Sequence, residues 1–451
     1  MTLPPLKSAA ELWYSDGSQA PIFEVDSPDP GLEIYRPEVF QTIEEEIGKL
    51  DKELKELSID IHGCEVASHL AQTSDCAGRD RPPRTYIRRN KNWHVKKNHL
   101  LKTAWVATFT HGTGGRTLGV NSEMDALPGI GHACGHNLIA IAGVAVALAV
   151  KVAMLKHDIP GKLVLIGTPG MFDLGSIFWM RLSMCIAEEG GSGKGILLEK
   201  GAYEGIDACL MCHPAAGPKH GASLSSCLAL RRFAVEYKGH SAHAAQSPWE
   251  GQNALDASVS AYNNISMLRQ QLKPSHRVHG VFSGKDWAAN IIPDNSEMLW
   301  YVRAPTWAEV KQANRAAAHA TGCKLTIEDP GEPTYDLRQN KALGSAFSEV
   351  FRSKFGPIDY EFGICSASTD FGNVTYAMPA LHPSFSIPTV PDGGIHTPAF
   401  ATAAATPEAH QACLNVAKVL ALTGVRVLAD DAFFDEVKMT FEEDKKMRGM
   451  I

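Results

Sequence analysis

Residues 117 to 150, TLGVNSEMDALPGIGHACGHNLIAIAGVAVALAV, combine a short strand pattern, a glycine-rich turn and a long apolar run. The first six residues favour a strand, and the run from Leu138 to Val150 predicts a helix that is buried on all sides. A strand pattern precedes this stretch at 104 to 109, AWVATF, and another follows it at 162 to 167, KLVLIG. This alternation of strands and helix predicts an α/β domain.

A different order of elements begins at Leu228 and runs to residue 333. The patterns there follow each other as strand, helix, strand, strand, helix, strand, which is typical of a ferredoxin-like fold. We therefore predict that residues 228–333 form an inserted α+β domain, and that residues 1–227 and 334–451 together form the α/β domain. Before the first strand, residues 40–57 carry apolar side chains at helical spacing and predict an amphipathic helix.

Composition and charge exclude several classes of function. The 451 residues are 44% hydrophobic and 21% charged, which suits a globular chain of two or more domains. The formal net charge of −7 offers no basic surface for nucleic acid or for a membrane. The opening MTLPPLKSAAELWYSDG lacks the pattern of a secretory signal, and the run that ends at Val150 has 13 apolar residues, short of the roughly 20 that span a bilayer. The ten scattered cysteines suit reduced thiols, so we expect a cytoplasmic protein that acts on a small molecule.

The strongest chemical signal is MDALPGIGHACGHN, residues 124 to 137, where Cys134 and His136 stand two apart and close to Asp125. Thiolate and imidazole are suitable ligands for zinc, and glycines let a short turn position them without strain. A buried cysteine beside a capping histidine is the structural alternative. A nucleophilic Cys134 is a third interpretation, which predicts inactivation by thiol alkylation but not by metal chelation.

A second signal is AEEGGSGKG, residues 187 to 195, in which Glu188 and Glu189 are adjacent. In a metal hydrolase one carboxylate can bind metal while its neighbour takes a proton from water. A solvated pair of loop glutamates is the alternative. A phosphate-binding loop is excluded, because Glu188 stands where that pattern requires glycine and Gly195 replaces its serine or threonine.

Two more histidines stand where predicted strands end or loops begin. His213 ends the strand pattern ACLMCHPA, and His396 lies in the glycine-rich GGIHTPAF. Cys209, Cys212 and His213 also match the attachment pattern of c-type haem, which does not suit an intracellular α/β enzyme without an export signal. Four separated segments that each bring a ligand to a loop indicate one composite site.

Taken together, these motifs resemble the aminoacylase and carboxypeptidase metallopeptidases, family M20 in peptidase nomenclature. The resemblance covers about residues 100 to 422 and is strongest to the subgroup of aminoacylase-1-like and p-aminobenzoyl-glutamate hydrolases. It implies an α/β catalytic domain of the zinc peptidase type with an inserted ferredoxin-like domain for lid closure and dimerisation. The motifs that carry it are GIGHACGHN, AEEGGSGKG, GHSAHAAQSPWEGQNALDA (239 to 257), NIIPD (290 to 294), STDFGNV (368 to 374) and IHTP.

The resemblance also implies cofactors and an activity. The reaction is hydrolysis of the amide bond of an N-acyl amino acid or a dipeptide by a homodimer that holds two divalent metal ions. A cysteine ligand favours zinc, while carboxylate and imidazole also suit manganese. The residues that match the family's metal ligands are Cys134, His136, Glu189, His213 and His396.

Further residues match other roles of the family. Glu188 matches the general base and acid, and Asp125 matches the carboxylate that orients a ligand. His243 matches a histidine that reaches the partner subunit's active site and stabilises the oxyanion. Asn290 resembles a residue at the polar end of the substrate, and Arg303 is a candidate for binding its carboxylate.

The chain departs from the family at residues 170–186, GMFDLGSIFWMRLSMCI, which separate Thr168 and Pro169 from the AEEGG motif. These 17 residues correspond to 51 nucleotides, and GGT ATG TTT for Gly-Met-Phe contains a fungal-type GTATGT splice donor. TGC ATA GCC for Cys-Ile-Ala contains an AG acceptor. A translated, unspliced intron is therefore our hypothesis, and cDNA in which all 51 nucleotides are the main species would contradict it. A real loop here would narrow or block the pocket, so a metal-binding or regulatory homologue without activity is the rival function.

A second departure spans residues 64–98, where relatives carry an amphipathic helix. This segment is rich in arginine and has almost no periodic apolar positions. A solvated loop or a misread exon is favoured over a nucleic-acid patch. We expect it to be poorly packed.

Overall fold

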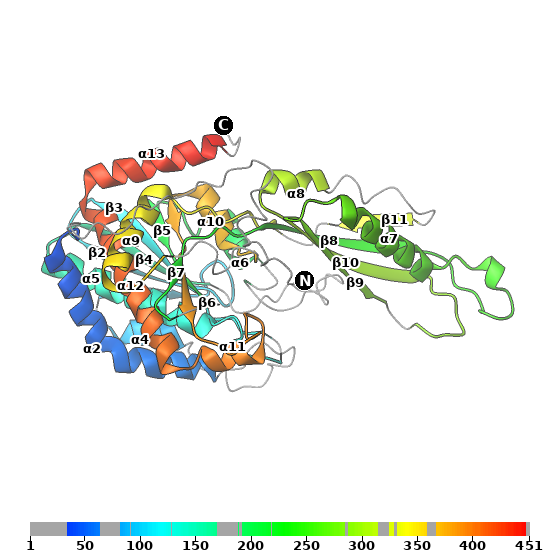
Figure 1. Ribbon diagram of the computed structural model, residues 1–451, viewed down its shortest axis with the longest axis horizontal. Helices are drawn as coiled ribbons and strands as arrows, with labels where there is room; N and C mark the ends of the chain where they lie inside the picture. The colour runs from blue at the N-terminus through cyan, green and yellow to red at the C-terminus, as the bar shows by residue number, and fades with distance from the viewer. Residues whose placement is uncertain are drawn as a thin grey trace, which may run out of the picture. The chain divides into compact units, whose positions relative to one another are not determined.

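The structure is a computed structural model that describes residues 34–63, 82–90, 92–127, 129–168, 188, 192–217, 219–284, 287–313, 324–328, 332–358 and 367–447. The described chain forms two compact units (Figure 1). One unit contains the described residues from 228 to 336, and the other contains those before and after it. Both helices and sheets are present, so the expectation of a mixed α/β protein is confirmed.

A six-stranded mixed sheet forms the centre of the larger unit. Strands β3, β4, β5 and β12 pair in parallel, whereas β2 pairs antiparallel with β4 and β1. The strands predicted at 104–109, 117–122 and 162–167 correspond to β2, β3 and β4, within two residues at each end. In sheet order the strands are β1 (His94–Lys97), β2 (Trp105–His111), β4 (Gly161–Gly167), β3 (Arg116–Ser122), β5 (Ala208–Leu210) and β12 (Ala380–Leu381).

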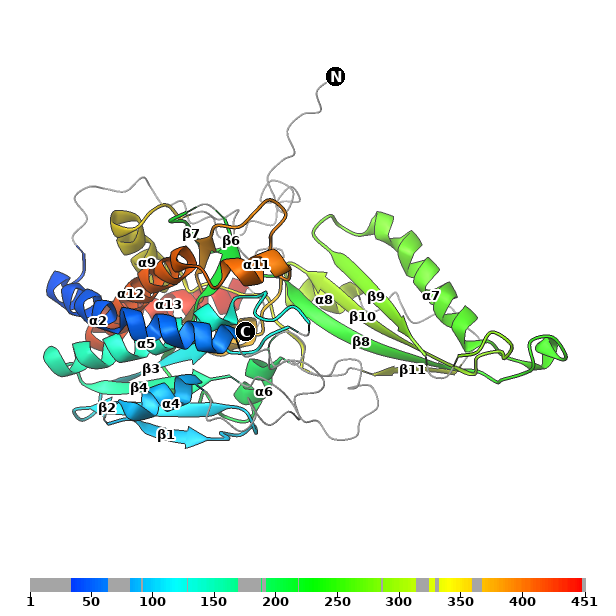
Figure 2. The ribbon, with the colours of Figure 1, turned by 90° about the horizontal axis from the view of Figure 1, so that it is seen from below.

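Apolar side chains cover both faces of this sheet, as expected for strands that are buried on both sides. On β4, Leu163 and Leu165 face the main core, while Val164 and Ile166 belong to a second core on the other face. Helices α5 (His136–Lys156), α12 (Pro407–Ala429) and α2 (Pro37–His62) pack together over the first face (Figure 2). Residues of α6 (Gly193–Glu199) and α10 (Phe371–Ala377) belong to the second core.

The long apolar run is a core helix. Helices α5 and α12 are long and apolar enough to cross a membrane, but 89% and 72% of their apolar windows are buried within the protein. Helix α2 contains the amphipathic helix predicted at 40–57 and turns its apolar stripe toward α5 and α12. Its buried apolar residues are Val39, Phe40, Ile43, Ile47, Leu54, Leu57 and Ile61.

The larger unit also contains a second sheet and further helices. A small three-stranded sheet is ordered β6, β13, β7, with β13 parallel to β6 and antiparallel to β7. Its strands are β6 (His213–Ala216), β13 (Ser384–Ile387) and β7 (Ala222–Ser223). The other helices are α9 (Lys341–Lys354), α11 (Pro398–Ala403) and α13 (Asp431–Met447).

The expectation of a poorly packed segment at 64–98 is wrong for its second half. Helix α4 (Pro82–Arg89) packs against α2 and α5, and β1 adds an edge strand to the sheet. Ile87 is fully buried in the main core, and the hydroxyl of Tyr86 donates a hydrogen bond to Glu53 on α2 at 2.8 Å. One buried isoleucine and one tyrosine hydrogen bond hold this short helix in place. The periodicity of the sequence does not predict the helix. Residues 64–81 and the segment 170–186 lie outside the described residues.

The smaller unit is a four-stranded antiparallel sheet with helices between its strands. The chain order of strand, helix, strand, strand, helix, strand and the sheet order β11, β8, β10, β9 confirm the ferredoxin-like prediction. Two short 3₁₀ turns, Pro248–Glu250 and Arg269–Gln271, flank the longer helix. The elements are β8 (Ala229–Lys238), α7 (Ala254–Leu268), β9 (Arg277–Ser283), β10 (Asn295–Ala304), α8 (Trp307–Ala313) and β11 (Lys324–Glu328).

Gly143 brings helix α5 against the end of β3, directly beside the site. A Cβ atom at Gly143 would lie 2.6 Å from the carbonyl oxygen of Asn121, whereas one at Gly48, exposed on α2, would meet nothing within 4 Å. We expect Gly143→Ala to lower the free energy of unfolding by about 1–3 kcal/mol through overpacking. Gly48→Ala should raise it by about 0.5–1 kcal/mol through helix propensity. Urea unfolding midpoints measure both, and equal shifts in the same direction would contradict the close approach of α5 and β3.

Candidate metal centre

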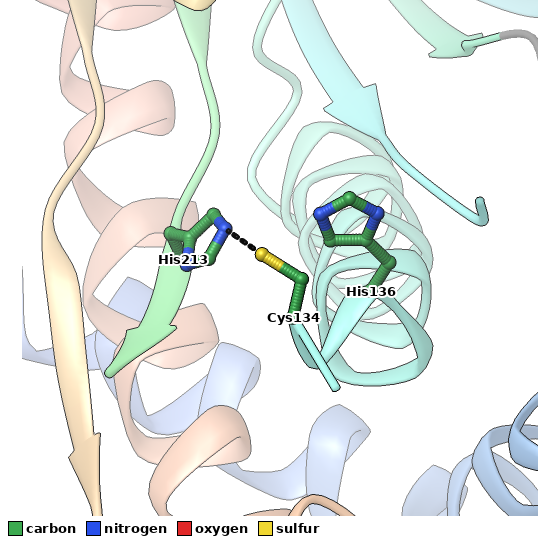
Figure 3. A group of neighbouring side chains, drawn as sticks. All are labelled: Cys134, His136 and His213. Atoms are coloured by element: carbon green, nitrogen blue, oxygen red, sulfur yellow. Dashed lines mark hydrogen bonds between the residues drawn. The ribbon is translucent and has the colours of Figure 1, made fainter. Parts of the chain in front are cut away.

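Three of the five predicted metal ligands lie together in the larger unit. Cys134 precedes α5, His136 is the first residue of α5, and His213 is the first residue of β6. One donor atom from each lies within 4.8 Å of the other two, and all three side chains are buried (Figure 3). The sulfur of Cys134 is 3.4 Å from Nε2 of His213. Segments almost 80 residues apart in the chain therefore converge on one point.

Gly135 makes this convergence sterically feasible. Its φ of 76° lies in the left-handed region, where a side chain is strained, and it precedes the first turn of α5. A Cβ atom there would lie 2.5 Å from Cγ of Pro214. Only glycine allows the turn between Cys134 and His136 to lie against the residue that follows His213.

The hydrogen bonds of the two histidines define their tautomers. Nδ1 of His136 donates to Oδ1 of Asp125 at 2.8 Å, and Nδ1 of His213 donates to the carbonyl oxygen of Pro214 at 2.7 Å. Both acceptors are oxygens, so each neutral ring keeps its lone pair on Nε2. Nε2 of His136 is buried and has no hydrogen-bond partner within the described part of the chain. A thiol and two outward-facing Nε2 atoms, one of them unpartnered, fit a divalent cation such as zinc.

Asp125 controls the charge on His136. Burial alone would lower the pKa of His136, but the carboxylate of Asp125 and the neighbouring Cys134 outweigh burial and raise that pKa well above its usual value. Conversely, burial would raise the pKa of Asp125, and the charges of His136 and Lys194 lower it to about 2. Asp125 is therefore a carboxylate throughout the physiological range.

Asp125 also holds the candidate general base. The backbone N–H of Glu188 donates to Oδ2 of Asp125 at 3.2 Å, and Glu188 is half-buried. One carboxylate thus fixes both a candidate ligand, His136, and the residue proposed to move the proton. Glu189, the predicted carboxylate ligand, lies outside the described residues.

His396 lies beside this site without joining the three donors. Its backbone N–H donates to the carbonyl oxygen of Ala133 at 2.8 Å, so its loop is fastened to the turn that carries Cys134. Its φ of 67° is left-handed, which is unusual for a residue other than glycine. Its side chain is not among the donors within 4.8 Å of one another.

A buried ionic cluster next to the site was missed by sequence reasoning. The ammonium group of Lys194 pairs with the carboxylates of Glu123 and Asp370, and all three side chains are at most 1% exposed. The backbone N–H of Lys194 also donates to Asp370 at 2.7 Å. Lys194 belongs to AEEGGSGKG and Asp370 to STDFGNV, so both motifs contained a signal that was not used.

His382 is a second residue that the sequence did not single out. It is buried, its ring lies 6.0 Å from that of His213 and 5.3 Å from that of Phe371, and neither of its ring nitrogens has a hydrogen-bond partner among the residues that the structure describes. Burial and the nearby His213 hold its pKa well below the usual value. His382 is therefore a neutral imidazole close to the site.

The remaining candidates lie in the smaller unit, where two of them are neighbours. Nδ1 of His243 accepts hydrogen bonds from the backbone N–H groups of Ala245 and Gln246, each at 3.1 Å. The N–H of Ala244 donates to the carbonyl oxygen of Asn290 at 3.0 Å, which ties the two candidate loops together. Arg303 is eight residues along β10 from Asn295, or roughly 26 Å of extended chain, so it lies far from Asn290. The unit by itself does not bring Arg303 into one subsite with Asn290.

Known proteins share this organisation. A peptidase dimerisation domain of M20 enzymes matches residues 230–321. The chain is 39% identical to mouse Xaa-Arg dipeptidase over 368 residues, which cover 78% of this chain and 80% of the relative. It is 26% identical to a p-aminobenzoyl-glutamate hydrolase of Escherichia coli, over 76% of this chain and 83% of that protein. A dinuclear metal binding M20 peptidase of Bacillus subtilis has the same fold, with a TM-score of 0.57 and 18% identity over 84% of this chain and 99% of that one.

The fold and the relatives define a metallopeptidase of two compact units, with a buried group of one cysteine and two histidines that could hold a metal ion. The chain belongs to the M20 peptidase family. The predicted class of activity, hydrolysis of an amide or peptide bond, is thereby confirmed.

The ion pair of His136 and Asp125 gives the metal-free protein a specific pH dependence. Because the folded-state pKa of His136 is raised and that of Asp125 is lowered to about 2, the pair stabilises the fold fully between about pH 4 and pH 6.5. This contribution is lost as the pH rises through the folded-state pKa of His136 or falls toward that of Asp125. Asp125→Asn should therefore destabilise the metal-free protein more at pH 6 than at pH 9, by roughly 3 kcal/mol at the lower pH. Urea unfolding in the presence of a chelator measures this, and a larger loss at pH 9 would show that the pair is not charged.

Proposed function

We propose that this protein is a metal-dependent dipeptidase whose centre is formed by Cys134, His136 and His213. The observation that carries this proposal is the arrangement around Asp125. That carboxylate accepts hydrogen bonds from the ring of His136 and from the backbone of Glu188, so it couples a metal ligand to a general base. A metal-free binding protein has no need for this coupling.

The donor set supports zinc. A thiolate with two imidazoles is a common zinc environment, whereas carboxylates and carbonyls suit manganese better. A solved relative that binds two metals supports a dinuclear centre, to which Glu189 and His396 would contribute. When bound, such a centre polarises the substrate carbonyl and makes a water molecule more acidic.

Glu188 moves the proton in this reaction. Its backbone is held by Asp125, and its half-buried position leaves the side chain accessible to substrate. The carboxylate takes a proton from the attacking water and then returns it to the amine that leaves. Asp125 stays ionised, since its pKa lies at about 2 in the metal-free protein and a bound metal ion would place positive charge nearby.

His243 supplies a hydrogen bond to the oxyanion. Because Nδ1 accepts two backbone N–H groups, the neutral ring must carry its proton on Nε2. The ring therefore presents a donor, which is what a developing oxyanion requires. We assign this donor to the active site of the partner subunit.

The relatives support two candidate substrate classes. The 39% identity to an Xaa-Arg dipeptidase over most of both chains favours dipeptides with a C-terminal arginine. An N-acyl amino acid such as p-aminobenzoyl-glutamate is the second class, supported by a more distant relative.

A homodimer in the cytoplasm fits the smaller unit and the cysteines. The unit matches a dimerisation domain, and β9 is an edge strand on which Val281 and Phe282 are partly exposed. Exposed apolar side chains on an edge strand favour pairing with a second copy. The five described cysteines are buried and form no disulfide, which suits a reducing compartment.

Glu188→Gln tests the mechanism. We expect hydrolysis of Xaa-Arg dipeptides by the zinc-loaded protein to fall about 10²- to 10⁴-fold, because the general base is lost. Glu199→Gln, an exposed glutamate on nearby α6, is the matched control and should leave the rate unchanged. Chelation should abolish activity of the parent protein, and activity that survives both chelation and Glu188→Gln would refute the proposal. A panel of dipeptides and N-acyl amino acids ranks the two substrate classes.

Mixing two inactive variants tests the role of His243 in the partner's site. Glu188→Gln and His243→Ala each disable the enzyme, but a heterodimer of the two holds one complete site. Equal amounts should recover about a quarter of the parent activity, since half of the randomly formed dimers carry one working site of two. Absence of any recovery, with subunit exchange verified by mass spectrometry, would place His243 in its own subunit's site or outside catalysis.

A further inference from the structure

Glu123 has one carboxylate oxygen that no hydrogen bond from the described residues satisfies. The residue directly follows β3, and its side chain is fully buried. One oxygen, Oε1, pairs with the ammonium group of Lys194. The other, Oε2, has no hydrogen-bond partner in the described part of the chain and lies 3.6 Å from Nε2 of His136. This nitrogen is the one that His136 keeps for a metal.

The spacing of these two atoms suits a shared ion. Zinc binds imidazole nitrogen and carboxylate oxygen at about 2.0–2.2 Å, so two such donors on one tetrahedral ion lie roughly 3.3–3.6 Å apart. The distance of 3.6 Å between Oε2 of Glu123 and Nε2 of His136 is at the upper end of that range. In the metal-free protein the two atoms attract each other as an ion pair when His136 is protonated. Neither atom has a hydrogen bond within the described part of the chain, and a metal ion bound between them would satisfy both.

The charges around Glu123 also favour a bound cation. Glu123, Asp125 and Asp370 are three buried carboxylates, of which Lys194 pairs with two and His136 with the third, so three negative charges face two positive ones. Burying charge without compensation is costly, so the excess of negative charge favours a divalent cation nearby. Lys194 is itself fixed, because its backbone N–H and its ammonium group both contact Asp370.

We propose that Glu123 is a further carboxylate ligand of the metal centre, and that Lys194 is the positioning residue that holds its second oxygen toward the ion. This inference rests on the proposed metal centre and adds a residue that the motif comparison did not assign. The inference also gives Lys194, the lysine of AEEGGSGKG, a role. Its ion pair with one oxygen of Glu123 fixes the carboxylate in an orientation that leaves the other oxygen for the metal.

Cobalt(II) binding tests the inference without any measurement of hydrolysis. The full-length protein is stripped of metal and titrated with cobalt(II) against a competing chelator, and the visible absorption of the bound ion is recorded. Glu123→Gln should weaken binding at least about tenfold and shift the absorption bands, because a charged oxygen donor is lost. Asp207→Asn is the matched control, since Asp207 binds the N–H of Thr117 at the opposite end of β3 and should change neither property.

Lys194→Met tests the positioning role. It should weaken cobalt(II) binding when Glu123 is present and have less than a twofold effect in the Glu123→Gln background, because its influence passes through Glu123. If Lys194→Met does not fold, Glu123→Gln alone decides the assignment. A parent protein that binds no cobalt(II) would overturn the metal centre and this inference together. Normal binding by the parent, with unchanged affinity and spectrum in Glu123→Gln, would overturn this inference only.

Discussion

The carboxylate of Asp125 accepts one hydrogen bond from the ring of His136 and another from the backbone of Glu188. The first bond directs the lone pair of His136 to the point that Cys134 and His213 also face. The second positions Glu188, the residue that we propose transfers the proton. A buried carboxylate with two charge-assisted bonds is stiff, and stiffness matters because metal ligation and proton transfer tolerate little displacement. The metal centre and the proton-transfer group therefore share one support.

The scaffold delivers these groups through close backbone contacts. Gly143 lets α5 cross the end of β3, which carries the strand into the segment containing Glu123 and Asp125. Gly135 lets the start of the same helix lie against Pro214, the neighbour of His213. A helix that is buried on nearly every side has no freedom to shift, so these two contacts set the position of His136 relative to β3 and β6.

Candidate residues lie in both units. The larger unit holds the three buried donors and Glu188, the proposed base, and charges act more strongly in a low-dielectric surrounding. The smaller unit holds His243, whose donor tautomer is defined by two local backbone hydrogen bonds.

Local sequence by itself determined the α/β architecture, the ferredoxin-like order of the smaller unit and the residue types of the candidate metal ligands. These features depend on periodicity, turn residues and donor type, which are properties of short segments. The helix at 82–89 escaped this reasoning because one isoleucine and one tyrosine anchor it through contacts with distant helices. Only the tertiary structure decided that Cys134, His136 and His213 converge, and that Glu123, Lys194 and Asp370 form an ion cluster beside them. Contacts between residues far apart in the chain, and the burial that makes them strong, arise only when the sheet and helices have closed around them.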